Sequence, residues 1–176
     1  MSKKILVAVD GSEHMAQIME KAVDMARKEE AELLLLHVIA PHVLSEEEVD
    51  YAEERCGKKF KQLVRGDFLP AFQIEDGAER KYIGDYVKAR KIFQNVYGED
   101  MLKQAREMAE KQGLKNVQTL LEKGPVAKVV LDVAKKQDVD LIIVGRHGHN
   151  AIAEFFLGSV AQKILQYADR SVLTVQ

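Results

Sequence analysis

Short apolar runs alternate with amphipathic stretches along most of this chain. The runs "KILVAV" at 4–9 and "ELLLLHVI" at 32–39 are continuous and aliphatic, which is typical of strands buried on both faces of a parallel sheet. Between them, Ser12 offers a helix N-cap. The apolar residues that follow recur at helical spacing: Met15, Ile18, Met19, Ala22, Met25 and Ala26. A strand, a helix and a strand of this length predict one right-handed crossover unit.

The same alternation occupies the C-terminal half. Three further strands are predicted by "NVQTLLE" at 116–122, "DLIIVG" at 140–145 and "SVLTVQ" at 171–176. Gly124 and Pro125 open a helix, with proline at its first position. Its apolar stripe comprises Val126, Val129, Val130, Val133 and Ala134. A last helix is predicted at residues 159–167. Five strands alternating with helices favour an α/β fold, an open doubly wound five-stranded parallel sheet flanked by helices.

Residues 42–98 break this alternation. They hold most of the aromatic residues among dense charges, whereas a disordered linker would be poor in aromatic residues. The stretches 46–64 and 78–93 have helical patterns and are separated by a turn-rich connection. We interpret residues 1–176 as a single α/β domain with a helical insertion at about 42–98, followed by a helix that starts near Glu99. The insertion either packs against the domain or supplies a surface for a partner.

Charge and cysteine content narrow the classes of function. The chain has 26 Lys and Arg residues against 28 Asp and Glu, so no strong basic field favours nucleic acid as a partner. The first apolar run ends at Asp10 and is too short for a signal peptide or a membrane span. Cys56 is the only cysteine, which excludes an intramolecular disulfide framework and a cysteine-based zinc site. We therefore expect a cytoplasmic protein without membrane contact.

The segment "GRHGHNAIAEFFLGSV" at 145–160 carries the candidate chemistry. Gly145, Gly148 and Gly158-Ser159 have the spacing G-x2-G-x9-G-S. Glycines at a strand exit let backbone N–H groups approach a phosphate, and the helix start at Gly158-Ser159 favours an anion. If the first and fourth strands are neighbours, Asp10 and Gly145 flank the crevice where the strand order reverses. Asp10 would then face a sugar or a base, because a carboxylate repels phosphate.

Other types of site fit the sequence less well. Neither a Walker A motif nor a G-x-G-x-x-G motif follows the first strand. His147 and His149 lack the partners of a zinc motif, which favours polar loop side chains near a ligand over metal ligands. His37, near the end of an apolar strand, is interpreted as a buried histidine with its hydrogen bonds satisfied. No catalytic residue is assigned, because no Ser, His and Asp set can be assembled.

Four segments together resemble the nucleotide-binding branch of the universal stress protein family: "KILVAVDGSE", "LLLLHV", "GPVAKVVLDVAKKQDVDLIIVGRHG" and "GSVAQKILQYADRSVLTV". The resemblance implies a strand order 3-2-1-4-5, with ATP, AMP or ADP bound at the switch between strands 1 and 4 and Mg²⁺ held through the phosphates. It also implies a homodimer formed through the last strand, which "SVLTVQ" can supply as an exposed edge.

The resemblance also implies the role of each site residue. Ala8, Asp10 and Val38 line the adenosine end, with Val38 contributing its backbone. Gly145, His147 and Gly148 wrap the ribose and phosphates, and Gly158, Ser159 and Val160 hold the phosphate tail. Two features depart from the family. Ala8 stands where some members carry proline, and the segment before Gly98 is longer than usual, so that it covers the site, extends the dimer or binds another protein.

The expected function is adenine-nucleotide binding in a stress response, with occupancy as the signal and little intrinsic catalysis. This follows from a phosphate loop without an evident general base, arginine finger or metal-carboxylate pair. One alternative is an ATP-hydrolysing or nucleotidyl-transfer enzyme whose acceptor pocket comes from the insertion. Another is a dimeric scaffold that binds proteins through the insertion.

Overall fold

The computed structural model describes residues 3–12, 14–40, 54, 78–146 and 157–176, with only the backbone for residues 78–89. Contacts between Cα atoms divide the chain into two compact units, Met1–Pro41 with Gly98–Gln176, and His42–Tyr97. All five strands lie in the first unit. A single domain over residues 1–176 with an insertion at about 42–98 stays a prediction.

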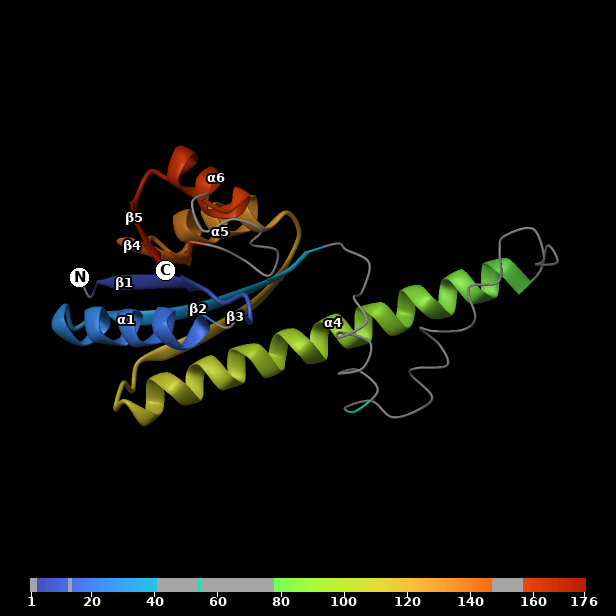
Figure 1. Ribbon diagram of the computed structural model, residues 1–176, viewed down its shortest axis with the longest axis horizontal. Helices are drawn as coiled ribbons and strands as arrows, with labels where there is room; N and C mark the ends of the chain where they lie inside the picture. Colours follow the sequence, from blue (N-terminus) through green and yellow to red (C-terminus); the bar gives the residue numbers. More distant parts are fainter. Residues whose placement is uncertain (1–2, 13, 41–53, 55–77, 147–156) are drawn as a thin grey trace. The chain divides into compact units, whose positions relative to one another are not determined.

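The sheet has the predicted order, β3-β2-β1-β4-β5, and every neighbouring pair is parallel (Figure 1). The elements are β1 (Lys4–Ala8), α1 (Met15–Lys28), β2 (Glu32–Ile39), α4 (Ala78–Lys111), β3 (Val117–Lys123), α5 (Val126–Lys136), β4 (Leu141–Gly145), α6 (Ser159–Tyr167) and β5 (Ser171–Val175). The structure therefore confirms the predicted open α/β fold and places β5 at one edge of the sheet.

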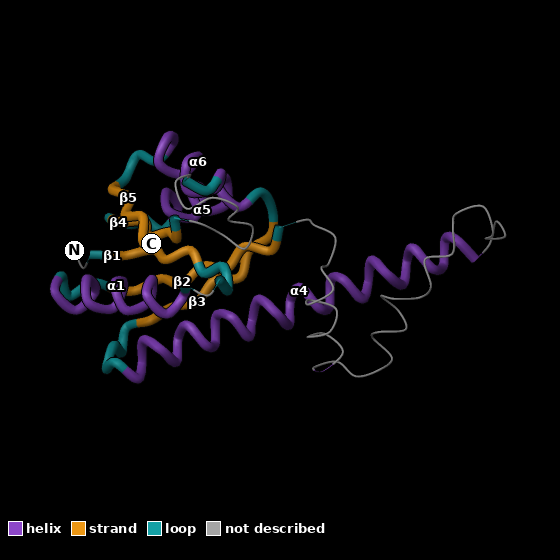
Figure 2. The backbone as a smooth tube through the Cα atoms, viewed as in Figure 1, coloured by secondary structure: helices purple, strands orange, loops and turns teal. Residues whose placement is uncertain are grey.

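Buried side chains on the two faces of the sheet form two cores, and a layer of helices covers each (Figure 2). Alternate residues of a strand point to opposite faces, which splits the apolar runs between these cores. One core combines Ile5, Val7, Leu33 and Leu35 with residues of α1 and α4, and the other combines Leu6, Leu34 and Leu36 with residues of α5 and α6. Burial on both faces explains why β1 and β2 read as continuous apolar runs.

Two of the predicted helix starts are wrong. The N-cap of α1 is His14 rather than Ser12, because the Ser12 amide donates to Asp10 Oδ1 at 3.0 Å in a turn that precedes the helix. Pro125 is the N-cap of α5 rather than its first helical residue. The buried stripe of α1 is confirmed, with Val23 added and Met25 only partly buried.

Helix α4 is longer than the sequence predicts. It runs without interruption from Ala78 to Lys111, so the expected helix start near Glu99 is wrong. Gly98 lies inside the helix, where a Cβ atom would come within 2.6 Å of Leu121 Cδ1 and 2.9 Å of His37 Cδ2. Glycine therefore permits close packing of α4 against β2 and β3 at this point. Of the insertion, residues 78–97 belong to α4, and the earlier expected helix at 46–64 lies outside the described residues except for Glu54.

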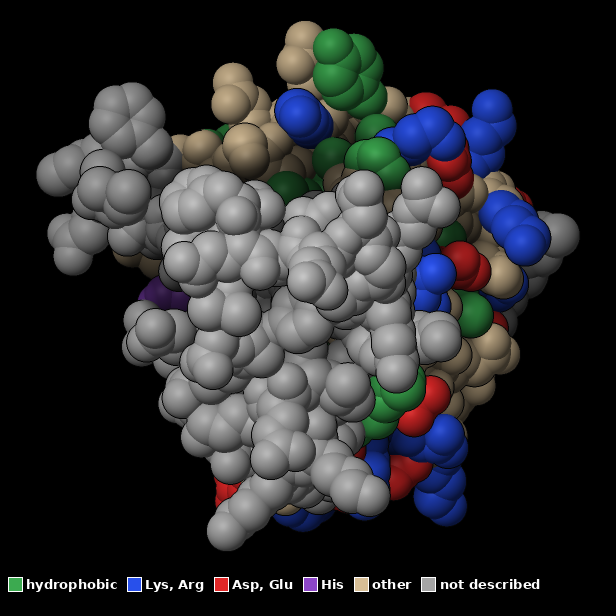
Figure 3. All heavy atoms as spheres, turned by 90° about the vertical axis from the view of Figure 1, so that its right-hand side faces the viewer, with side chains coloured by type: hydrophobic (Ala, Val, Ile, Leu, Met, Phe, Trp, Pro, Cys, Tyr) green, Lys and Arg blue, Asp and Glu red, His purple; other side chains and the backbone are tan. Residues whose placement is uncertain are grey.

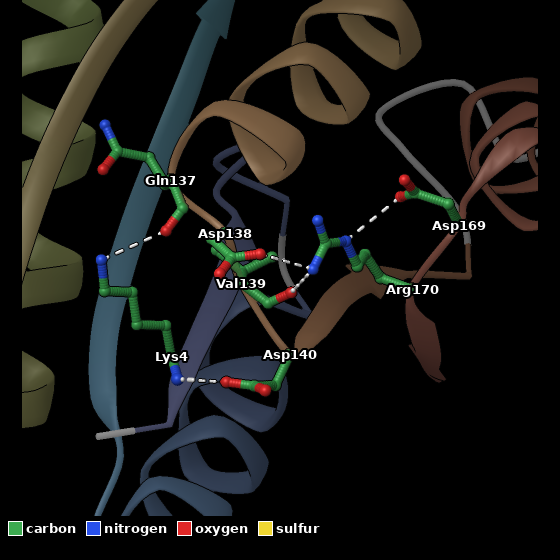
Figure 4. Close-up of polar contacts among 7 residues, drawn as sticks. All are labelled: Lys4, Gln137, Asp138, Val139, Asp140, Asp169 and Arg170. Atoms are coloured by element: carbon green, nitrogen blue, oxygen red, sulfur yellow. Dashed lines mark hydrogen bonds and ion pairs between the residues drawn. The ribbon is translucent and has the colours of Figure 1, made fainter. Parts of the chain in front are cut away.

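A polar cluster closes the amino-terminal edge of the sheet (Figure 4). The Lys4 amide donates to Asp140 Oδ2 at 2.8 Å, which joins the starts of β1 and β4. The Arg170 guanidinium, just before β5, donates to Asp138 Oδ1 at 2.9 Å and to the Val139 carbonyl at 3.3 Å. The hydrogen bond to Asp138 raises the pKa of Arg170 above its ordinary value, so the guanidinium keeps its charge. These bonds lie at the amino-terminal ends of the strands, opposite to the carboxyl ends, where the sequence predicts a ligand.

The described charges are of mixed sign. On the face drawn in Figure 3, basic and acidic side chains lie next to one another, in keeping with the near balance of charge in the sequence. Among the described helices, none combines the length and the apolar composition that crossing a membrane requires.

Candidate functional site

The strand order reverses between β1 and β4, and three of the predicted site residues, Ala8, Asp10 and Gly145, lie at or just after the ends of these two strands. The two strands are adjacent and parallel, with Val7 paired to Ile143. Ala8 ends β1 and Gly145 ends β4, so Asp10 and Gly145 follow neighbouring strands at the same carboxyl edge. In open α/β sheets, ligands bind outside the carboxyl ends of the strands at such a switch point.

The turn after β1 is held by hydrogen bonds on both sides of Asp10. The Val9 amide donates to the Leu36 carbonyl at 2.8 Å, and His37 Nδ1 lies 2.8 Å from the Val9 carbonyl oxygen. Asp10 Oδ1 then accepts the Ser12 amide, and Gly11 between them has φ of 71°. A positive φ suits glycine, which accounts for the residue type at this turn. The position of Asp10 is thus set by the backbone around it.

Val38 stands near the end of β2 with its side chain buried among residues of the core between the sheet, α5 and α6. The ladder between β1 and β2 ends at Ala8 and Leu36, two residues before Val38. On the other side of β2, pairing with β3 continues past Val38 to Ile39. The predicted contribution of the Val38 backbone to a ligand stays a prediction.

The exit of β4 is bonded to the start of α6 and to the end of β5. The carbonyl of Arg146 accepts the Gly158 amide at 2.9 Å, and the Arg146 amide donates to the Val175 carbonyl at 2.7 Å. The Arg146 side chain donates to Gln176 Oε1 at 3.1 Å. The chain that leaves β4 therefore returns to it at Gly158. Sequence analysis missed the role of Arg146, because its bonds to Gly158 and Val175 are made by its backbone.

The start of α6 is suited to an anion. Gly158 is the N-cap and makes no side-chain capping bond, and the first turn carries no acidic residue. Ser159 and Val160 are exposed at this end, with 37% of Val160 accessible. Free N–H groups at a helix start attract negative charge. His147 and Gly148, together with His149, Phe155 and Phe156, lie outside the described residues, as does Cys56.

Two further expectations concern histidines and metals. His37 is 8% exposed and hydrogen-bonded, which confirms a buried, satisfied histidine. Among the residues that the structure describes, no group of three or more His, Cys, Asp or Glu side chains is arranged to hold a metal ion.

The strand order and the parallel pairing define an open α/β protein whose strand order reverses between β1 and β4. Residues 1–176 match the universal stress protein family, and the chain belongs to that family. A putative universal stress protein of Staphylococcus saprophyticus is 31% identical over 175 residues, covering 99% of this chain and 83% of the relative. The universal stress protein YxiE of Bacillus subtilis is 30% identical over 176 residues, covering 100% of both chains.

Solved structures of universal stress proteins share the fold. The UspA structure from Lactobacillus plantarum has a TM-score of 0.62 at 19% identity, covering 99% of this chain and 97% of that one. A universal stress protein in complex with cAMP has a TM-score of 0.58 at 18% identity, with the same coverage. The protein from Archaeoglobus fulgidus in complex with dAMP has a TM-score of 0.55 at 16% identity, covering 99% of this chain and 98% of that one.

Proposed function

We propose that this universal stress protein binds an adenine nucleotide, foremost ATP, at the carboxyl edge between β1 and β4. The observation that carries this proposal is the bond between Arg146 and Gly158, which brings an uncapped helix start back to the exit of β4. Phosphate is the natural ligand of such a helix start. The cAMP and dAMP complexes of two structural relatives support adenine nucleotides as the ligand class.

The proposed contacts divide the nucleotide into three parts. Ala8, Asp10 and the Val38 backbone hold the adenosine end, Gly145, His147 and Gly148 wrap the ribose and phosphates, and Gly158, Ser159 and Val160 hold the phosphate tail. Mg²⁺, if bound with ATP, is held through the phosphates. The Asp10 carboxylate belongs beside the sugar, since negative charge next to the phosphates would weaken binding.

Occupancy of the site, rather than turnover, is the proposed signal in a stress response. Chemistry on ATP requires groups that activate a nucleophile and neutralise developing charge, and no residue is assigned to these roles. The proposal includes a homodimer formed through β5, an edge strand of the sheet. It also includes a protein partner at residues 42–98 and a cytoplasmic setting, the latter resting on the single cysteine.

Titration calorimetry with ATP, with AMP and without nucleotide tests the proposal, with phosphate release followed in the same samples. We expect saturable binding of one ATP per chain and phosphate release close to the uncatalysed background. Absence of binding at millimolar ATP with magnesium would contradict the proposed function. Turnover well above the background would instead support the enzyme alternative.

A further inference from the structure

The hydrogen bond between His37 and Val9 interrupts a regular pattern of strand pairing. In a parallel ladder, the backbone groups of alternate residues point to the same neighbouring strand. The Leu36 carbonyl accepts the Val9 amide, so Leu36 and, two residues later, Val38 direct their N–H and C=O groups toward β1. If the pairing continued, the Val38 amide would donate a hydrogen bond to the Val9 carbonyl. In the structure, His37 Nδ1 is instead the hydrogen-bond partner of that carbonyl, at 2.8 Å.

In this hydrogen bond, His37 is the donor and Val9 the acceptor. A carbonyl oxygen only accepts, so Nδ1 carries the proton and donates to Val9. In the described part of the chain, no backbone bond joins Val38 to Val9. Buried backbone groups generally find partners, and a ligand at this edge is one way to supply them. The N–H and C=O of Val38 are thus a donor and an acceptor side by side.

Helix α4 holds the imidazole in place from the other side. A Cβ atom on Gly98 would lie 2.9 Å from His37 Cδ2, closer than side-chain contacts normally allow. His37 is 8% exposed, so its ring has little room to turn away from Val9.

We propose that His37 is a positioning residue for the nucleotide base: by occupying the Val9 carbonyl, its imidazole ends the ladder between β1 and β2 and leaves the Val38 N–H and C=O for adenine. This inference rests on the proposed nucleotide site and adds its selectivity. Adenine presents an acceptor nitrogen beside its N6 amino donor, whereas guanine places the O6 carbonyl where adenine has the amino group. That carbonyl would face the Val38 carbonyl, so adenine is favoured over guanine.

Two variants of the full chain separate positioning from packing. His37→Asn keeps an N–H donor at the place of Nδ1, whereas His37→Leu removes the donor and retains apolar bulk. Leu35→Val, a buried change on the same strand, controls for lost stability. We expect wild type, His37→Asn and Leu35→Val to prefer ATP over GTP by at least about tenfold, and His37→Leu to lose about tenfold in ATP affinity and most of the preference. An unchanged preference in His37→Leu would overturn the inference.

Amide hydrogen exchange at Val38, measured by NMR without nucleotide, tests the same inference independently of binding. In His37→Leu the Val9 carbonyl can accept a hydrogen bond from the Val38 amide. Because that bond protects the amide, hydrogen exchange at Val38 should slow by about tenfold or more relative to Leu36. His37→Asn should exchange as wild type does. If the wild type binds neither ATP nor GTP, the proposed function fails, and the exchange result still decides the role of His37. Equal Val38 exchange in wild type and His37→Leu would overturn it.

Discussion

The amide of Gly158 donates a hydrogen bond to the carbonyl oxygen of Arg146 over 2.9 Å. This single bond joins the exit of the fourth strand to the start of the last helix. It brings Gly158 back to the residue that follows Gly145, although the two glycines are far apart in the sequence.

Gly158→Val should weaken ATP binding much more than it weakens folding. Gly158 has φ of −58° and ψ of 145°, a conformation that valine adopts readily, so the backbone strain that glycine would avoid is absent. The new side chain instead blocks the approach of phosphate to the helix start. We expect at least about a tenfold loss of ATP affinity in calorimetry. Gln162→Val, exposed on the same helix, is the matched control and should bind ATP normally. Normal binding by Gly158→Val would show that the glycine spacing is incidental.

Asp10→Asn and Asp10→Ala should differ in a defined way. Asparagine keeps an acceptor for the Ser12 amide and loses the charge, whereas alanine loses both. We expect Asp10→Asn to retain wild-type stability and to lose about fivefold in ATP affinity, and Asp10→Ala to lose about 1 kcal/mol of stability and more affinity. Urea unfolding and calorimetry measure the two effects. Wild-type ATP affinity in both variants would remove Asp10 from the site.

Gly98→Ala, a substitution inside α4, should weaken ATP binding. Its Cβ atom would press on Leu121 and on the His37 ring, and the ring bonds to the turn that carries Asp10. We expect about a threefold to tenfold loss of ATP affinity. The double variant Gly98→Ala/Leu121→Ala leaves only the contact with His37 and should retain the loss. Recovery of full affinity in the double variant would trace the effect to Leu121 instead.

Asp140→Ala is expected to affect stability alone. Its carboxylate accepts the Lys4 amide at the amino-terminal edge of the sheet, which is the edge opposite the proposed site. Losing this bond should lower the free energy of unfolding by about 1 kcal/mol. ATP affinity should stay at the wild-type value in the same preparation. A loss of affinity comparable to that of Asp10→Ala would mean that binding reports only on stability.

The pair of Asp24 and Lys28 on α1 predicts a small dependence of stability on acid. The hydrogen bond from Lys28 lowers the pKa of Asp24 below its ordinary value of 3.8. The stabilisation is therefore complete above that value and is lost as the pH falls through the lowered pKa. Asp24→Asn should differ slightly from wild type at neutral pH and converge with it in acid, as measured by urea unfolding at several pH values. A difference that widens in acid would contradict the sign.

Much of the first unit could be predicted from the sequence, because burial on both faces leaves continuous apolar runs such as residues 32–39, and buried helix faces leave the stripe of α1. The continuation of α4 through Gly98 could not be predicted, because glycine commonly marks a helix end. The actual role of Gly98, close packing against Leu121 and His37, depends on residues distant in sequence. Ser12 failed as an N-cap because Asp10 competes for the same stretch of backbone.

The candidate site, like the fold, could be predicted from the sequence only in part. Glycine spacing pointed to the loop after β4 and to the start of α6, since both requirements are local. The partners of Arg146 and His37 could not be predicted, because each depends on which strand ends lie side by side. Sheet order and register, rather than residue type, bring these groups together.

Native mass spectrometry of the purified chain, before and after addition of ATP with magnesium, tests the central claim most directly. It reports both the occupancy and the identity of any nucleotide in one measurement. One adenine nucleotide per chain is expected, either carried through purification or taken up from solution, and Gly158→Val should take up far less. A wild-type chain that stays bare at millimolar ATP, while remaining folded, would contradict a nucleotide site between β1 and β4.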